Sequence, residues 1–150
     1  MKAVDRSSTA YRNIHNERGL HMMSKNRKLG HIGLAVNDLE ASVKWYCEVL
    51  GFEVIGAFET PDGVQARFLK SGDIVYEIFR PLVDVAVPGK IDHFCFESKD
   101  IAADYAYCVE QGYSFEEEGI QTIHTFWENG VSYFKIMSPT GEPVEFCQIL

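Results

Sequence analysis

One pattern in the sequence occurs twice, about 62 residues apart, and this duplication restricts the possible folds more than any other feature. Three pairs of residues occupy equivalent points, at the start of a strand, the cap of a helix and the glycine after that helix: His31 and His93, Asp38 and Asp100, Gly51 and Gly112. The three offsets are 62, 62 and 61 residues. Self-similarity at a fixed period is typical of a repeated supersecondary unit. The chain should therefore contain two copies of one module.

The first copy, residues 29–81, has the pattern of a βαβββ unit. In the run HIGLAV, apolar side chains alternate with small or polar ones, which predicts a half-buried strand. An apolar stripe at helical spacing follows, with Asn37 or Asp38 as its N-cap and Gly51 as the glycine that ends it. Three strand-like runs come next, FEVIGAF, VQARFLK and DIVYEIF, separated by the turn sequences PDG and SGD.

The second copy, residues 91–150, is expected to repeat this order. It contains a strand at HFCFES, a helix over 98–111, and strand-like runs at SYFKIM and PVEFCQI. Residues 82–90 then link the two modules. Residues 1–28 show no helical or strand periodicity and are expected to form a polar N-terminal extension. The sequence thus predicts an α+β domain of two tandem βαβββ modules over residues 29–150.

Composition and charge exclude several classes of protein. Apolar residues make up 46% and charged residues 24%, as in a globular domain, and no apolar run is long enough to span a membrane. The formal net charge is -8, and residues 29–150 hold 20 acidic against 7 basic side chains, so no nucleic-acid partner is expected. The N-terminus lacks the apolar region of a secretory signal, which favours a cytoplasmic protein. The four cysteines form no C-x-x-C pair and are expected to be reduced core thiols.

Each module carries one histidine in its first strand and one glutamate in its last strand. These residues are His31 and Glu77 in the first module, and His93 and Glu145 in the second. Side chains alternate along a strand, so all four are expected to point to the sheet face opposite the helices. A single histidine in a strand is more often structural than a ligand, but the matched pairs favour a metal site. The donor types suit one divalent ion: nickel, zinc, cobalt, manganese or iron.

Two stretches of the sequence resemble a known family. HIGLAVNDLEASVKWYCEVLGFEV is similar to the first module of the vicinal oxygen chelate superfamily, which includes glyoxalase I, methylmalonyl-CoA epimerase and extradiol dioxygenases. GDIVYEIFRP and SPTGEPVEFCQ resemble the family's glutamate-bearing last strands, and the resemblance covers residues 29–150. It implies the glyoxalase-like fold, in which two modules form a curved, open, mixed sheet around one metal ion, with the helices on the outer face.

The resemblance also implies an activity. The ligand order His, Glu, His, Glu matches glyoxalase I (lactoylglutathione lyase), a lyase that transfers a proton beside a carbonyl through a metal-bound enediolate. Glu145 is the expected catalytic base by similarity to the second-module glutamate, and Glu77 is the second choice. Bacterial glyoxalase I has Arg at the position of Ala35 and Asn near Pro81, both linked to glutathione, so the use of glutathione stays open. The alternatives are an epimerase of an acyl-CoA or sugar acid, a dioxygenase, and a non-catalytic protein that binds small molecules such as antibiotics.

Four further residues are candidates for the pocket of a small carbonyl substrate. The segment IHTFWENGV is rich in aromatic residues, and His124, Phe126 and Trp127 are expected either to wall the pocket or to pack on the sheet. Arg67 is a candidate for an anionic group of the substrate, although a solvated strand arginine is the simpler interpretation. The exposed edges of an eight-strand sheet, and the pairing of modules across subunits in the family, favour a homodimer.

Overall fold

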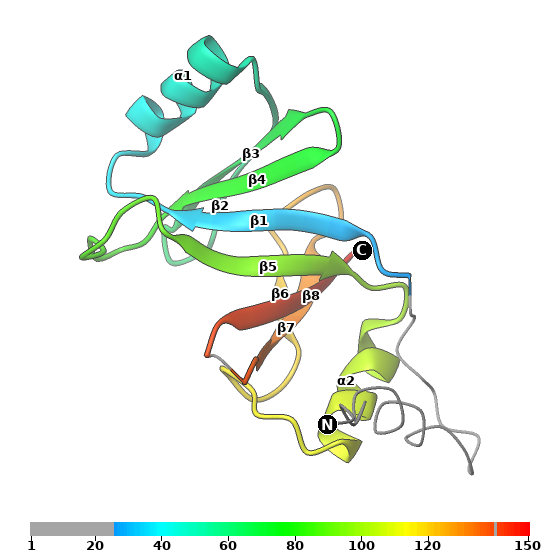
Figure 1. Cartoon of the computed structure of the whole chain (residues 1–150). Helices are drawn as coiled ribbons and strands as arrows, with labels where there is room; N and C mark the ends of the chain where they lie inside the picture. The colour runs from blue at the N-terminus through cyan, green and yellow to red at the C-terminus, as the bar shows by residue number, and fades with distance from the viewer. Residues whose placement is uncertain (1–25, 140) are drawn as a thin grey trace, which may run out of the picture.

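The computed structural model describes residues 26–139 and 141–150, and within them the two modules follow the expected order (Figure 1). The elements are, in chain order, β1 (Leu29–Ala35), α1 (Leu39–Leu50), β2 (Glu53–Glu59), β3 (Gln65–Ser71), β4 (Ile74–Arg80), β5 (Ile91–Glu97), α2 (Ile101–Glu110), β6 (Gln121–Ile123), β7 (Val131–Met137) and β8 (Pro143–Ile149). Most of the expected N-terminal extension, residues 1–25, lies outside the described residues. The prediction of two βαβββ modules is confirmed.

All of these strands belong to one mixed sheet with the order β2-β3-β4-β1-β5-β8-β7-β6. The first module forms one half and the second module forms the other half in mirrored order. The halves meet where β1 pairs antiparallel with β5. Within each module the first strand pairs in parallel with the last, β1 with β4 and β5 with β8. The four strands that carry the candidate ligands are therefore the four central neighbours of the sheet.

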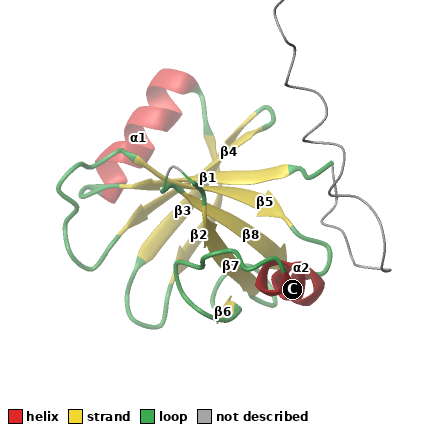
Figure 2. Ribbon diagram, turned by 60° about the horizontal axis from the view of Figure 1, so that its bottom comes forward, coloured by secondary structure: helices red, strands yellow, loops and turns green. Residues whose placement is uncertain are grey.

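The two helices begin in the same way, because an aspartate caps each of them. The carboxylates of Asp38 and Asp100 accept hydrogen bonds from the backbone N–H groups of Ala41 and Ala103, both at 3.0 Å. Gly51 ends α1 with a φ of 68°, a left-handed conformation in which glycine meets no steric penalty. α1 contacts β3 and β4, and α2 contacts β7 and β8. The helices thus lie at opposite ends of the outer face of the sheet (Figures 1 and 2).

The strand alternation predicted from the sequence divides the core into two sides. On the outer face, each helix covers one apolar cluster. The cluster of the first module includes Leu34 and Ile78, and that of the second includes Phe134 and Phe146. The inner face carries a third cluster: Ala66, Phe68, Cys95, Phe126, Val131 and Cys147. This inner cluster spans both halves of the sheet, so it surrounds the space in which the candidate ligands lie.

The second module departs from the first in its third element. β6 has only three residues, whereas the equivalent β2 has seven. The chain before β6 contains three consecutive glutamates, residues 116–118, which cannot be buried on both faces of a sheet. Only Phe115 in this stretch forms an isolated bridge, to Ile136 of β7. Neither helix has the length and hydropathy of a helix that crosses a membrane.

The chain just before β1 packs against the second module. The guanidinium of Arg27 lies 2.5 Å from a carboxylate oxygen of Asp104 on α2, and 4.9 Å from the centre of the Phe146 ring. Its side chain is only 12% exposed. Arg27 falls within the polar extension expected from the sequence, because a single charged residue shows no helical or strand periodicity. Its contacts join the start of the first module to the helix of the second.

Candidate metal centre

Four neighbouring strands bring one potential ligand each to the inner face of the sheet. In their order across the sheet, these are Glu77 on β4, His31 on β1, His93 on β5 and Glu145 on β8. The register aligns them closely, because Gly33 of β1 pairs with both Glu77 and His93, and Cys95 of β5 pairs with both His31 and Glu145. The two modules of one chain can therefore supply all four side chains to one site.

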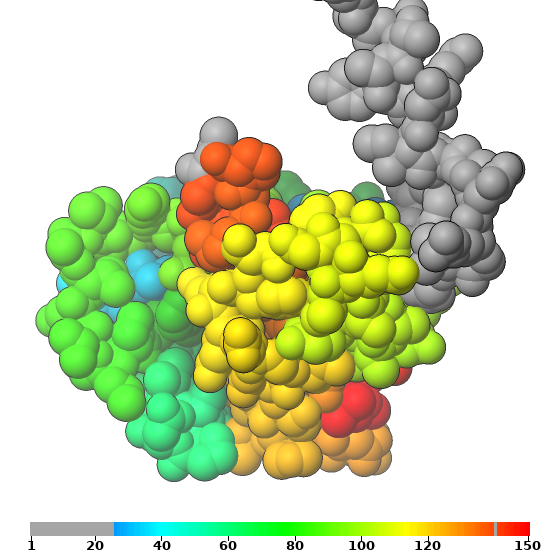
Figure 3. Space-filling view, turned by 90° about the horizontal axis from the view of Figure 1, so that it is seen from below, coloured from blue at the N-terminus to red at the C-terminus, as the bar shows by residue number. Residues whose placement is uncertain are grey.

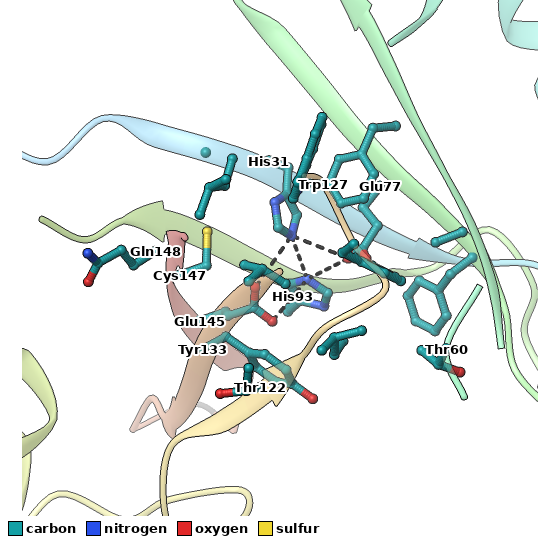
Figure 4. A pocket seen from close by; sticks show the side chains of 18 of the residues that line it. His31, Thr60, Glu77, His93, Thr122, Trp127, Tyr133, Glu145, Cys147 and Gln148 are labelled. Carbon is teal, nitrogen blue, oxygen red and sulfur yellow. Dashed lines mark hydrogen bonds and ion pairs between the residues drawn. The ribbon is translucent and has the colours of Figure 1, made fainter. Parts of the chain in front are cut away.

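The potential ligand atoms converge on one point (Figure 4). The Nε2 atoms of His31 and His93 are 3.1 Å apart. Oε2 of Glu77 lies 3.3 Å from each of these nitrogens. Glu145 reaches them with both of its oxygens, Oε1 at 3.5 Å from His31 and Oε2 at 3.5 Å from His93.

These separations fit a divalent ion, because the ligand atoms of His31, Glu77 and His93 all lie within 4.8 Å of one another and Glu145 approaches both histidines at 3.5 Å. Ligand atoms that are about 2.0–2.2 Å from a tetrahedral ion lie roughly 3.3–3.6 Å from one another. Three of the four residues are buried, with His31 7%, His93 3% and Glu145 6% exposed. Two carboxylates in such surroundings are costly unless cations or a metal compensate them. The donor set of two imidazoles and two carboxylates is one that zinc, nickel, cobalt, manganese and iron accept.

The two histidines and two glutamates also change each other's proton affinity. Burial raises the pKa of Glu77, but hydrogen bonds from His31 and His93 and their charge outweigh burial and hold this pKa well below its usual range. Burial lowers the pKa of His93, but hydrogen bonds to Asp92 and Glu77 and the charge of Glu145 raise it to about 9. A metal ion that binds Nε2 of His93 must therefore displace a proton.

Two charged residues lie behind the candidate ligands. Asp92 accepts a hydrogen bond from Nδ1 of His93 at 2.8 Å, which leaves Nε2 to face the candidate site. Nζ of Lys135 on β7 lies 3.8 Å from Asp92, 3.9 Å from Glu145 and 3.4 Å from Glu116. Burial lowers the pKa of Lys135, but these carboxylates raise it further, above its usual value. Lys135 therefore stays charged and connects the carboxylate behind His93 with the carboxylate of Glu145.

The four side chains lie in the floor of a cavity of about 890 Å³ on the inner face of the sheet. Figure 3 shows that segments of both modules, green and yellow to orange, lie side by side on the face seen from below. Aromatic rings form much of its wall: Phe68, Phe79, Phe126, Trp127 and Tyr133. Thr60 and Asp62 line one part of the rim, and Lys99 and Gln148 line another. An apolar cavity with a few polar groups is typical of a small-molecule site.

The structure brings two of the four expected pocket residues to this cavity. Phe126 and Trp127 line it, and Trp127 packs 5.1 Å from Phe68, centre to centre. Arg67 alternates in β3 with residues that face the cavity, so it points to the outer face, where Nη2 lies 3.3 Å from Glu40 of α1. His124 is exposed and is not among the residues that line the cavity. The interpretation of Arg67 as a strand arginine outside the pocket is therefore the one that the geometry favours.

Several of the residues that line the cavity are not among those predicted from the sequence. The alternation of side chains along a strand, with its period of two residues, indicates some of them. Phe79 follows Glu77 by two residues and Cys147 follows Glu145 by two, so each shares the face of its glutamate. Lys135 lies opposite Glu145 only because of the register between β7 and β8. That register depends on the loop between the two strands, and strand alternation alone does not determine it.

The sequence of the chain matches the model of a known protein family. The model of the glyoxalase/bleomycin resistance protein/dioxygenase superfamily matches residues 28–146. The chain belongs to this superfamily. The match confirms the resemblance to vicinal oxygen chelate proteins, and it covers both modules and all four candidate ligands.

Individual relatives agree with this membership. The uncharacterized protein YwbC of Bacillus subtilis is 32% identical over 127 residues, which are 81% of this chain and 98% of YwbC. The ethylmalonyl-CoA/methylmalonyl-CoA epimerase of Cereibacter sphaeroides is 34% identical over 86 residues, 51% of this chain and 64% of the epimerase. The crystal structure of methylmalonyl-CoA epimerase from Mycobacterium tuberculosis superposes with a TM-score of 0.70 at 21% identity, covering 87% of this chain and 94% of the epimerase. At that identity the superposition shows a shared fold.

Proposed function

We propose that this chain is a metal-dependent isomerase of the epimerase type, which removes and returns a proton on the carbon next to the carbonyl of an acyl thioester. The observation that carries the proposal is the convergence of two imidazoles and two carboxylates, with nitrogen and oxygen atoms 3.1–3.5 Å apart, at the floor of an aromatic cavity. A divalent ion bound there supplies Lewis-acid stabilisation of negative charge on the carbonyl oxygen of a substrate.

Glu145 is the residue proposed to move the proton. A base must reach the acidic carbon, and Glu145 lines the cavity at the β8 side. Lys135 lies 3.9 Å from its Oε2 and is held in place by Asp92 and Glu116. This ammonium group gives the Glu145 carboxylate a cationic partner that does not depend on the metal. Glu77 is the second choice for the role, because it also lines the cavity and lies 3.3 Å from each of the two histidines.

The aromatic wall has a role in the same chemistry. Phe126 packs edge-to-face against Phe68, Trp127 packs against Phe68 at a tilt, and the ring of Phe68 lies 5.3 Å from that of His31. Such a wall keeps water from the reacting carbon and strengthens electrostatic interactions within the cavity. Trp127 holds this position in a turn with a φ of 57°, a backbone conformation that is unusual for a bulky residue.

The relatives named as acyl-CoA epimerases support an acyl thioester as the substrate class, ahead of a glutathione hemithioacetal. A glyoxalase I-like lyase is the second candidate, because both glutamates are present in the His, Glu, His, Glu order. The two reactions share the abstraction of a proton beside a carbonyl. They differ in the group that carries the carbonyl, so substrate tests separate them.

The test combines metal content with proton exchange. The full chain should purify with one divalent ion, and the double variant His31→Ala and His93→Ala should fold but lose it. His124→Ala is the matched control, since this exposed histidine lies outside the cavity. Exchange of the α-proton with deuterated solvent is then followed on 2-methylacyl-CoA thioesters and on hemithioacetals. Exchange on thioesters alone supports the epimerase, exchange on hemithioacetals alone moves the proposal to the lyase, and the absence of metal after incubation with nickel, zinc, cobalt or manganese contradicts both.

A further inference from the structure

Two buried cysteines lie beside the four candidate ligands. Cys95 follows His93 on β5 by two residues, and Cys147 follows Glu145 on β8 by two, so both thiols point to the inner face of the sheet. Cys95 is 0% and Cys147 is 7% exposed. The Sγ atoms of the two cysteines and one carboxylate oxygen of Glu145 all lie within 4.8 Å of one another. Neither thiol has a role in the proposed proton transfer.

These thiols form a second group of ligands that overlaps the first. One ligand atom from each of His31, Cys95, Glu145 and Cys147 can be chosen so that all four atoms lie within 4.8 Å of one another. The set of His31, Glu77 and His93 meets the same limit. Two sulfurs, one nitrogen and one oxygen is a donor set that zinc accepts in tetrahedral geometry and that softer ions prefer.

We propose that His31, Glu145, Cys95 and Cys147 form an alternative seat for a thiophilic divalent ion such as cadmium, here called the thiol seat. His31 and Glu145 belong to both ligand groups. Only one of the two seats, the thiol seat or the seat made with Glu77 and His93, can therefore be occupied at a time. An ion that moves to the thiol seat exchanges Glu77 and His93 for two sulfurs. Each thiol releases its proton to solvent as it binds the ion.

The position of the two cysteines allows an ion to reach this seat from the cavity. Cys147 lines the cavity wall, and in Figure 4 its sulfur lies on the same side of the site as His31. Cys95 lies on the neighbouring strand, fully enclosed, and its Sγ is 3.8 Å from the carbonyl oxygen of Phe96. An ion would thus meet Cys147 first and be enclosed by Cys95. Ions that prefer oxygen and nitrogen, such as manganese, gain nothing from this move.

The choice of seat has a consequence for activity. In the thiol seat, Glu145 remains a ligand beside two sulfurs, and the side of the site near Glu77 and His93 is left without an ion. Cadmium should therefore inhibit the enzyme, while manganese should not. This consequence rests on the proposed function, whereas the existence of the thiol seat does not.

The experiment uses cadmium chloride as the probe and needs no substrate. The full chain, freed of metal with a chelator, is titrated with cadmium while the ultraviolet absorption of the cadmium–thiolate bond is recorded and calorimetry gives the stoichiometry. Wild type should develop this absorption and saturate at one cadmium per chain. The double variant Cys95→Ser and Cys147→Ser should lose the absorption. Cys108→Ser is the matched control, because Cys108 is equally buried but lies on α2, in the cluster of the outer face.

Two variants separate the thiol seat from a general loss of metal binding. His93→Ala and Glu77→Gln leave the thiol seat intact, so each should keep the cadmium–thiolate absorption, whereas His31→Ala should lose it. These variants retain both cysteines, so they test the proposal even where the double serine variant does not fold. The proposal is overturned by wild type that binds cadmium without thiolate absorption, by loss of the absorption in Glu77→Gln and His93→Ala, or by two cadmium ions bound to one chain. None of these outcomes depends on whether the chain is an epimerase.

Discussion

Gly33 leaves the space that the imidazole of His93 occupies. The two residues pair across β1 and β5, and a Cβ on Gly33 would overlap Cε1 of His93 and lie 2.5 Å from its Nδ1. Gly33 also pairs with Glu77 on the other side. The absence of one side chain in the middle strand thus lets two ligands from neighbouring strands approach each other.

Gly33→Ala should therefore strongly weaken metal binding. The added methyl group pushes the His93 ring out of its position, and metal sites lose affinity when a ligand is misplaced. We expect the affinity for zinc to fall by a factor on the order of 100 or more, measured by calorimetric titration of the chelator-treated chain. Gly30→Ala on the same strand is the control, because its Cβ would meet no atom closer than 3.5 Å. Wild-type affinity in Gly33→Ala would show that the ring can move without cost.

Arg27→Ala should destabilise the fold through α2. The substitution removes the cation beside the carboxylate of Asp104, and that carboxylate stays buried, because the Asp104 side chain is only 5% exposed. Breaking a buried ion pair typically costs about 3–5 kcal/mol, and urea unfolding should give a loss near the lower end, because the hydroxyl of Ser98 still donates to Asp104. Lys28→Ala is the matched control, because Lys28 pairs with Glu97 at an exposed position and should cost at most about 1 kcal/mol. Equal stability of the two variants would contradict the role given to Arg27.

The sequence was most informative where one rule of local geometry applied twice. Alternation along β1, β4, β5 and β8 gave the side of the sheet for His31 and Glu145, and the repeat gave the equivalence of the two modules. It was least informative where position depends on strand register or on a single long side chain. Arg67 shows the limit: its charge suggested a substrate contact, yet the same alternation, applied to Ala66 and Phe68, directs it to the outer face.

The affinity for metal should rise with pH up to about 9. Burial lowers the pKa of His93, but Asp92 and Glu77 raise it from 6.5 to about 9, so at neutral pH the metal-free chain carries a proton that a metal must displace. One displaced proton gives about a tenfold gain in apparent affinity per pH unit, and the gain should stop as pH passes 9. Zinc titrations from pH 7 to pH 9.5 measure this slope. A flat profile would contradict the protonated state of His93.

The stability of the metal-free chain should change in the opposite direction over the same range. Because the folded pKa of His93 is above its unfolded value of 6.5, the protonated imidazole stabilises the fold fully below that value. This contribution is lost as pH rises through about 9. The melting temperature of the chelator-treated wild type should therefore fall over this interval more than that of His93→Gln. Parallel curves for the two proteins would remove His93 as the cause.

Asp92→Asn should weaken metal binding without removing a ligand. Asp92 holds Nδ1 of His93 at 2.8 Å and shares Lys135 with Glu145, so the substitution loosens the orientation of the ring. Loss of such a partner typically lowers metal affinity about 10–100-fold, as calorimetry with zinc would detect. Asp84→Asn is the control, since this carboxylate lies in an exposed pair with Arg80. If the two variants bind zinc equally well, the hydrogen bond from His93 has no part in the site.

Glu145→Gln tests the proposed base and separates it from the ligand role. Glutamine keeps an oxygen that can bind a metal but cannot accept and return a proton, so the variant should retain zinc with reduced affinity. Loss of a general base typically lowers turnover by a factor of about 100 or more, and the readout is exchange of the α-proton on a 2-methylacyl-CoA thioester in deuterated solvent. Glu77→Gln is the matched comparison, because it also replaces one candidate ligand of the same kind, and it should retain more exchange than Glu145→Gln. Exchange at the wild-type rate in Glu145→Gln, together with loss in Glu77→Gln, would transfer the role to the glutamate of the first module.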